Sequence, residues 1–231
     1  MCGRFVSTKT PQQLADYFSV DELAVEQVTP NYNVAPTQSV LVVTENEEHR
    51  RSLEAHHWGL VPPWAKDVKI GNRMINARAE TVAEKPAFKK AFAVRRCLIP
   101  ADGFYEWKKS KDGTTKQPYF IHPTGEPVFA LAGIWERWRD PETDEWMRSC
   151  AIIVGEANTV IAPIHDRMPV VLSREHWDAW LDPENGDVED LGKLLVPAPA
   201  KAVTAYPVRT QVNSPRNNVP ENLDPDPDPK V

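Results

Sequence analysis

The sequence has little of several features that would place it in a common class of protein. Its 231 residues contain only three cysteines, too few for a disulfide framework, and no two of them form a CxxC metal or redox motif. No apolar run approaches the roughly 20 residues that a membrane-spanning helix needs. The N-terminus lacks a basic region followed by an apolar stretch, which is the pattern of a signal peptide. These absences predict a cytoplasmic protein without a membrane anchor.

Clusters of metal ligands are also missing. No group of His, Cys, Asp and Glu residues has the spacing of a metal site, so we expect neither a metal nor an organic cofactor. A hydrophobic content of 41% and a charged content of 26% are ordinary for a globular domain. A monomer is the default expectation. Cys97 and Cys150 lie in apolar runs and are expected to be inert buried thiols.

Excess positive charge is absent as well. Taken as a whole, the net charge of −6 argues against a nucleic-acid partner. The charge is uneven, however: residues 221–231 carry a net charge of −3, whereas residues 85–96 contain five basic residues and no acidic one. Because binding depends on the local field and not on the total, both a DNA-binding face and a merely solvated helix face remain open.

The sequence does contain a succession of strand signals with a few short helices. Helices are predicted at 11–18, from about Pro86, and after the capping residues Ser173 and Asp187. Strands are predicted at 40–44, 49–62, 96–109, 117–123, 127–138, 148–157 and 201–213. Because strands occur in runs and do not alternate with helices, the pattern predicts an α+β single domain over 1–220 with a largely antiparallel sheet. Residues 221–231 alternate Asp and Pro and are predicted to be disordered.

Cys2 has the most unusual position of any reactive residue. Removal of Met1, expected before a small residue, makes Cys2 the N-terminus, with an α-amine of pKa about 7.7 to 8.0 and a thiol of pKa about 8.5. Together they match an aldehyde: the amine forms an imine and the thiolate closes a five-membered thiazolidine. An N-terminal nucleophile that hydrolyses amides is the alternative chemistry. A tolerated second residue without function is the third interpretation, and position alone favours it.

Three segments hold side chains that could assist Cys2. Asn76 and Arg78 alternate in "INARAET", which would put them on one face of an extended chain. Glu106 lies among aromatic residues in "GFYEWKK", an apolar setting suited to proton transfer. His165 opens the polar stretch before the strand-like run of "IHDRMPVVL". Each also has a structural explanation, since a lone histidine more often makes a hydrogen bond and a glutamate in a strand more often faces water.

Nine segments together resemble one protein family. Their order and positions resemble those of the SOS-response-associated peptidase (SRAP) family. The segments are "CGRF", "NVAPTQ", "WGLVPPW", "INARAET", "ADGFYEWKK", "QPYFI", "LAGIWE", "IHDRMPVVL" and "VRTQVNSPRNN". The resemblance covers almost the whole chain. It implies an SRAP-like fold, in which the sheet is strongly curved or barrel-like and is flanked by short helices.

The resemblance also implies a function. Members of the family bind single-stranded DNA and capture the ring-opened aldehyde of an abasic site as a covalent thiazolidine, a lyase-like activity in the DNA-damage (SOS) response. By this resemblance Cys2 is the nucleophile and Asn76 holds the Cys2 amine and the sugar. Glu106 moves protons during ring opening and imine formation, and His165 handles a proton on the opened sugar. Peptidase activity, which the family name suggests, and non-covalent binding of single strands are the alternatives.

The resemblance further implies the residues that contact DNA. They are the phosphate-binding Arg4, Arg78 and Arg167, the base-stacking Trp64, and the cleft-lining Asn33 and Pro36. The expected partner is therefore single-stranded DNA that contains abasic sites, to which the protein binds in a salt-dependent way and with which it associates in the nucleoid.

Overall fold

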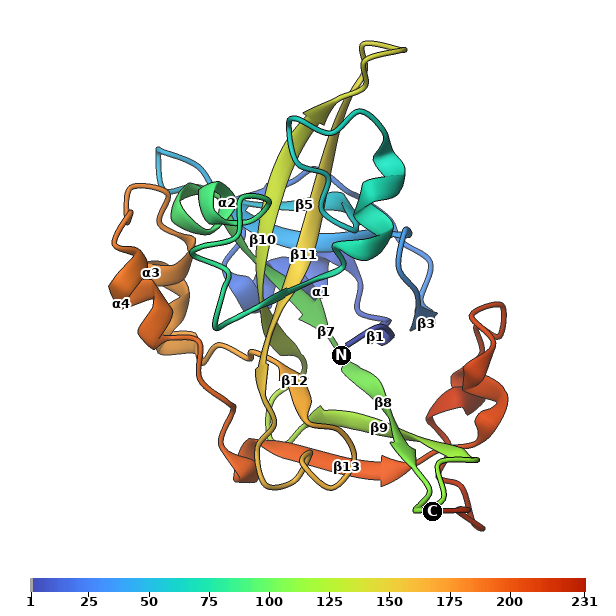
Figure 1. Cartoon of the computed structure of the whole chain (residues 1–231). Helices are drawn as coiled ribbons and strands as arrows, with labels where there is room; N and C mark the ends of the chain where they lie inside the picture. The colour runs from blue at the N-terminus through green and yellow to red at the C-terminus, as the bar shows by residue number, and fades with distance from the viewer. Residues whose placement is uncertain (1) are drawn as a thin grey trace.

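The computed structural model describes residues 2–231 and contains two β-sheets with short helices around them (Figure 1). Met1, the residue expected to be removed, lies outside the described residues. Within residues 2–231, no helix combines the length and the apolar character that crossing a bilayer takes. The predicted α+β class is confirmed.

Five strands of the larger sheet close into a barrel. Their bounds are β4 Ser39–Glu45, β5 Arg51–Trp58, β7 Arg96–Ala101, β10 Phe129–Arg139 and β11 Trp146–Glu156. The pairings β5–β4, β4–β7, β7–β10 and β10–β11 are antiparallel, and a parallel pairing of β11 with β5 closes the ring. The expectation of a mostly antiparallel, barrel-like sheet is therefore confirmed. Short strands extend it: β2 (Glu22–Leu23) pairs with β5, and β6 (Asn76–Arg78) and β12 (Arg167–Pro169) pair with β11.

The second sheet is antiparallel throughout and has the order β13-β9-β8-β1-β3. Its strands are β1 Phe5–Ser7, β3 Asn31–Val34, β8 Gly103–Lys109, β9 Lys116–Pro123 and β13 Val203–Pro207. The chain enters this sheet from the barrel where β7 ends and β8 begins, one residue apart. Gly103 makes that passage possible, because a Cβ there would lie 2.5 Å from the Ile121 carbonyl oxygen and from the Phe120 ring.

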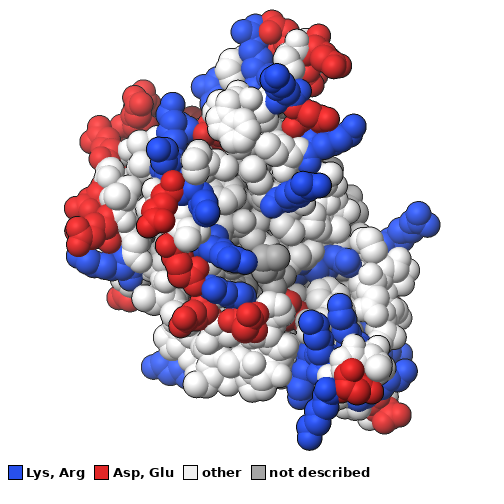
Figure 2. Space-filling model, in the orientation of Figure 1, with Lys and Arg blue, Asp and Glu red and all other residues white. Residues whose placement is uncertain are grey.

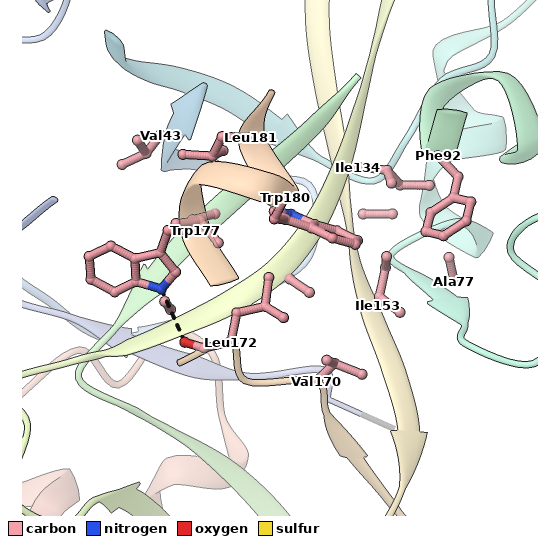
Figure 3. Packing of buried hydrophobic residues seen from close by; sticks show 14 of the residues in the cluster. Val43, Ala77, Phe92, Ile134, Ile153, Val170, Leu172, Trp177, Trp180 and Leu181 are labelled. Carbon is pink, nitrogen blue, oxygen red and sulfur yellow. Dashed lines mark hydrogen bonds between the residues drawn. The ribbon is translucent and has the colours of Figure 1, made fainter. Parts of the chain in front are cut away.

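Alternate residues of the barrel strands pack into two different cores. On β4, Leu41 and Val43 belong to the cluster that the helices cover, whereas Val40 and Val42 belong to the cluster that includes Cys2. Figure 3 shows the first cluster, in which the aromatic side chains of α3 (Trp177–Leu181) lie against the barrel strands. There the Trp177 Nε1 donates a hydrogen bond of 3.1 Å to the Leu172 carbonyl.

The helices begin largely where their capping residues predict. Thr10 and Gln13 exchange hydrogen bonds in a capping box at the start of α1 (Pro11–Phe18). Asp187 caps α4 (Val188–Lys193) by accepting from two backbone amides. By contrast, α2 (Lys89–Val94) begins three residues after Pro86, because the preceding turn closes with a shorter i to i+3 bond from Phe88 to Lys85. Short 3-10 segments are η1 Val68–Arg73, η2 Arg174–His176, η3 Ala200–Ala202, η4 Thr210–Asn213 and η5 Pro220–Leu223.

Residues 221–231, predicted from composition to be disordered, have defined contacts with the second sheet in the structure. Asn222 is fully buried and its Nδ2 donates 2.7 Å to the Asn217 carbonyl. Pro225 forms a β-bridge with Val208, and the Lys230 amide donates 3.0 Å to Gln117 Oε1. Composition missed these contacts because each is made by a backbone group or a single amide and not by an apolar face.

Candidate functional site

Cys2 lies at the junction of the two sheets, just before β1. Its side chain is fully buried in the cluster that contains Phe5 and residues of both sheets. The strand that follows is fixed on both sides, since Phe5 pairs with Phe104 of β8 and with Val34 of β3. Cys97 and Cys150 are also free and buried, as predicted. The position of Cys2 is therefore determined by the same pairing that builds the second sheet.

Asn76 reaches Cys2 from the barrel. It begins β6, which pairs in parallel with β11, and Asn76 lies opposite Ile152. Its Nδ2 donates a hydrogen bond of 2.8 Å to the Cys2 carbonyl oxygen. Its Oδ1 is buried and accepts no hydrogen bond within residues 2–231. The amide side chain thus presents an available acceptor beside Cys2.

Glu106 approaches Cys2 from the second sheet. It lies on β8, paired with Tyr119 of β9, and is almost completely buried. The neighbouring Tyr105 amide donates 2.9 Å to the Arg4 carbonyl, which ties this part of β8 to the segment after Cys2. The Glu106 carboxylate is close enough to Cys2 to act on the thiol electrostatically. Glu106 is thus a buried carboxylate whose charge acts on the Cys2 thiol.

The environment of Cys2 keeps its thiol protonated. Burial raises the pKa of the Cys2 thiol far above its ordinary value, and the negative charge of Glu106 raises that pKa further. The positive charge of the N-terminus and a hydrogen bond from the Arg4 amide lower that pKa only in part. Reaction as a thiolate therefore requires a nearby base to take the proton of the thiol. Glu106 is the carboxylate whose charge acts on that thiol.

His165 lies in the loop between β11 and β12. Ile161 of this loop packs in the same cluster as Cys2, and the His165 amide donates 2.9 Å to the Ile161 carbonyl. The imidazole Nδ1 accepts 3.0 Å from the Arg167 amide and also lies 2.9 Å from an Asp166 carboxylate oxygen. The first contact suits an unprotonated Nδ1 and the second a protonated one. The half-buried ring is thus provided with a partner in either protonation state.

Arg78 and Trp64 are the exposed members of the predicted DNA-contacting set. Trp64 is 60% exposed in the loop before η1, and Arg78 is exposed at the end of β6. Lys66, Lys69 and Arg73 are exposed in the intervening segment. Figure 2 shows Lys and Arg side chains on the upper right of this face, over the region where Figure 1 draws this segment in teal, whereas acidic side chains gather on the left edge. The exposed cations of this segment are therefore separated on this face from the acidic edge of the molecule.

Arg4 and Asn33 are committed to holding the chain together. Arg4 Nη1 donates to Asn33 Oδ1 at 2.7 Å and to the Val212 carbonyl at 3.0 Å. Asn33, which is buried, donates from Nδ2 to the carbonyls of Val212, Ser214 and Asn217. We call residues 212–217 the C-terminal strap. Arg4 and Asn33 fasten it beside β8.

Arg167 and Pro36 have intermediate surroundings. Arg167 forms an ion pair with Glu80, whose hydrogen bond and charge raise the pKa of the guanidinium further. Pro36 is half-buried after β3. Of the ten residues selected from the sequence, the structure brings Cys2, Asn76 and Glu106 into one site with His165 in an adjoining loop.

Trp58 is a residue that the sequence did not single out. It is fully buried, its indole Nε1 donates 3.0 Å to the Ile75 carbonyl, and its ring meets Phe5 edge-on with centroids 5.1 Å apart. It therefore joins the backbone next to Asn76 to the strand that follows Cys2. The only signal in the sequence was a tryptophan in "WGLVPPW", which does not distinguish a core residue from a base-stacking one.

Metal chemistry has no candidate site in the described part of the chain. No three His, Cys, Asp or Glu side chains within residues 2–231 are grouped so that they could hold a metal ion. The groups at the site are a thiol, a carboxamide, a carboxylate and an imidazole.

Comparison with known proteins places this arrangement in a family. The family model "SOS response associated peptidase (SRAP)" matches residues 1–215. The chain belongs to the SRAP family. The resemblance stated from the sequence is therefore confirmed. Among solved structures, a protein from Bacteroides thetaiotaomicron superposes with a TM-score of 0.87 at 27% identity, over 97% of this chain and 100% of that one.

Curated SRAP relatives carry a common name. "Abasic site processing protein YoqW" of Bacillus subtilis (strain 168) is 45% identical over 225 residues, which is 97% of this chain and 99% of that protein. "Abasic site processing protein YoaM" of the same organism is 44% identical over 97% of this chain and 98% of that protein. "Abasic site processing protein HMCES" of Gallus gallus is 33% identical, over 85% of this chain and 66% of its own length.

Proposed function

We propose that this SRAP protein processes abasic sites in single-stranded DNA by capturing their aldehyde covalently on Cys2. The observation that carries the proposal is the convergence on Cys2 of the Asn76 amide, at 2.8 Å from its carbonyl, and the Glu106 carboxylate. The names of the curated relatives describe processing of the same lesion.

The chemistry requires Cys2 to be N-terminal, so Met1 must be removed. The Cys2 amine then adds to the aldehyde carbon of the ring-opened sugar and water leaves, which gives an imine. The Cys2 sulfur next adds to the imine carbon while the imine nitrogen takes up a proton, which closes the thiazolidine. In total one aldehyde and one aminothiol give one thiazolidine and one water, and neither oxidant nor reductant is needed.

Asn76 orients the amine in this proposal. Its Nδ2 fixes the Cys2 carbonyl and its Oδ1 is an available acceptor, so the same side chain can hold both the backbone of Cys2 and a proton of its new amino group. An amine that is held with its lone pair towards the aldehyde loses less entropy on reaching the transition state, which lowers the barrier to imine formation.

Glu106 and His165 move the protons. Glu106 gives a proton to the carbinolamine hydroxyl as it leaves as water, and the resulting carboxylate then takes the proton of the Cys2 thiol, whose raised pKa makes a nearby base necessary. His165 exchanges a proton with the hydroxyl that ring opening releases on the sugar. Its two Nδ1 contacts, to Arg167 and Asp166, stabilise the ring before and after that exchange.

Arg78 and Trp64 are the DNA contacts that we propose first. Arg78 is exposed and suits a phosphate, and Trp64 exposes an aromatic face on which a base beside the lesion can stack. Arg167 reaches a phosphate only by exchanging Glu80 for it. Arg4 and Asn33 shape the same side of the site by holding β1, β3 and the C-terminal strap, and Pro36 follows β3.

Peptidase activity is the second candidate, because the family description contains the word. The same thiol, amine and carboxylate would serve a nucleophile that cleaves amides. The two candidates differ in their product. Single-stranded DNA with one abasic site should give a band that survives a denaturing gel and depends on Cys2, whereas a peptidase would give Cys2-dependent cleavage of a peptide and no such band.

A further inference from the structure

We propose that the end of the β8–β9 hairpin, residues 108–116, is a second contact surface for the DNA backbone. The inference rests on the proposed function and extends it to nucleotides beside the lesion. The segment carries Lys108, Lys109, Lys111 and Lys116 against Asp112, a net charge of +3 in a chain whose total is −6. Figure 2 shows Lys and Arg side chains gathered at the lower right, where Figure 1 places the end of this hairpin.

The lysines are placed against one another. Lys109 lies directly opposite Lys116 in the register of β8 and β9, and both are exposed. Like charges opposite each other in a sheet are destabilising. The lysine ion pairs within residues 2–231 involve Lys9, Lys69 and Lys193, so none relieves this repulsion. An anionic ligand that bridges the pair would relieve it.

The nearest acidic residue in the hairpin is used for another purpose. Asp112 accepts from the Thr114 amide at 3.1 Å and from Thr114 Oγ1 at 2.9 Å, and these bonds, together with one from Ser110, lower the pKa of its carboxyl. Asp112 thus shapes the turn and does not pair with a lysine. In the neighbouring tail, Asp226 is likewise engaged, since Gln117 Nε2 donates to it at 3.2 Å.

The position of the lysines relative to Glu106 suits a continuous strand of DNA. Lys108 follows Glu106 by two residues and therefore shares its face of β8. Lys109 follows Glu106 by three residues, about 10 Å along an extended strand, and it therefore lies with Lys116 on the opposite face of the hairpin from Glu106 and Lys108. Phosphates of a stacked strand are spaced by about 3.4 Å along the axis, so a strand that follows β8 from Glu106 would reach the end of the hairpin, where lysines occupy both faces, in about three nucleotide steps. In Figure 1 the segment that bears Arg78 lies on the opposite side of β1 from this hairpin.

The test measures non-covalent binding of the full-length chain carrying Cys2→Ala. Fluorescence anisotropy is recorded against salt concentration with single strands that contain a stable abasic-site analogue. One probe extends six nucleotides on both sides of the lesion, and two others extend on one side only. Lys109→Gln/Lys116→Gln is the test variant, and Lys193→Gln/Lys201→Gln, at two exposed lysines outside the hairpin, is the control with the same charge change.

We expect the slope of log K against log salt to become shallower by about 1.4 in the Lys109/Lys116 variant, as for the loss of two phosphate contacts to a single strand. The loss should be confined to the probe that extends on one particular side. The melting temperature should not fall, because the variant removes a repulsive pair. A slope equal to that of the Lys193/Lys201 control, or an equal loss on both one-sided probes, would overturn the inference. Absence of a covalent adduct with Cys2 intact would instead refute the proposed function.

Discussion

The Asn76 side chain binds the Cys2 carbonyl oxygen at 2.8 Å across 74 residues of sequence. Asn76 comes from the barrel and Cys2 from the entry to the second sheet, so this hydrogen bond holds the two sheets together at the reactive residue. Trp58 supports both ends of it, through the Ile75 carbonyl and through the Phe5 ring. The geometry of the site therefore depends on how the two sheets are joined, and the predictions below test that dependence.

Replacing Asn76 should slow capture more than it weakens the fold. Asn76→Ala removes one hydrogen bond, worth about 1 kcal/mol of unfolding free energy, and leaves the new amine without an acceptor. We expect the rate of adduct formation at saturating DNA to fall about tenfold or more, since misorientation of a reacting group is costly. Single-turnover gels measure the rate and urea unfolding measures the stability. An unchanged rate would remove Asn76 from the reaction.

Glu106→Gln should make the Cys2 thiol more acidic and yet slow the formation of the adduct. Since the negative charge of Glu106 raises the pKa of the Cys2 thiol, the neutral amide should lower that pKa, and Cys2 should be alkylated by iodoacetamide at lower pH than in the parent protein. Adduct formation should nevertheless slow by about a hundredfold, because the proton acceptor is lost. Mass spectrometry of the N-terminal peptide follows the alkylation. A pH profile that moves upward, or adduct formation at the parental rate, would contradict the assigned role.

Two exposed tryptophans provide a matched pair for testing base stacking. Trp64 and Trp146 are 60% and 59% exposed, but Trp64 lies in the loop before η1 whereas Trp146 lies in the β10–β11 hairpin. Trp64→Ala should weaken binding to the abasic-site analogue by about 1 to 3 kcal/mol with little change in melting temperature. Trp146 stacks on Arg137 and Arg139 in the β10–β11 hairpin, so Trp146→Ala should leave DNA affinity unchanged. Equal losses in the two variants would refute a specific stacking role.

Replacing Asn33 should lower the stability of the protein more than its affinity for DNA. Its amide makes three hydrogen bonds to the C-terminal strap and accepts one from Arg4, all largely shielded from water. Asn33→Ala should lower the free energy of unfolding by about 3 kcal/mol, since several groups lose buried partners together. Arg78→Gln should do the reverse: it should leave the urea midpoint unchanged and make the salt slope of binding shallower by about 0.7. An Asn33 variant as stable as the parent would show that the strap is held by other contacts.

The sequence predicted the fold class for reasons that the structure makes clear. The run of apolar and β-branched residues at Val40–Thr44 is a local property, so this strand could be predicted directly. The capping residues Thr10 and Asp187 act within one helical turn, so the starts of their helices could also be predicted from the sequence. Closure of the barrel by a parallel pairing of β11 with β5 joins segments about 90 residues apart, and only the family resemblance suggested it.

Other features could not be predicted because one residue type serves several purposes. Arg4 and Arg78 look alike in the sequence, yet one binds a backbone carbonyl and the other faces solvent. Asn33 was expected to line the DNA cleft, and the structure shows an amide committed to the strap. The tail is predicted to be disordered because its composition buries little, and composition does not register the backbone and amide groups through which Asn222 and Pro225 make their contacts.

The most direct measurement is the intact mass of the protein after incubation with single-stranded DNA that contains one abasic site. The account predicts a species equal to the protein without Met1 plus the DNA, less one water. It should be absent with Cys2→Ala, with DNA lacking the lesion, and in any fraction that retains Met1, whereas Cys97→Ala and Cys150→Ala should still form it. A covalent species that persists in Cys2→Ala, or one formed by protein that keeps Met1, would contradict the central claim.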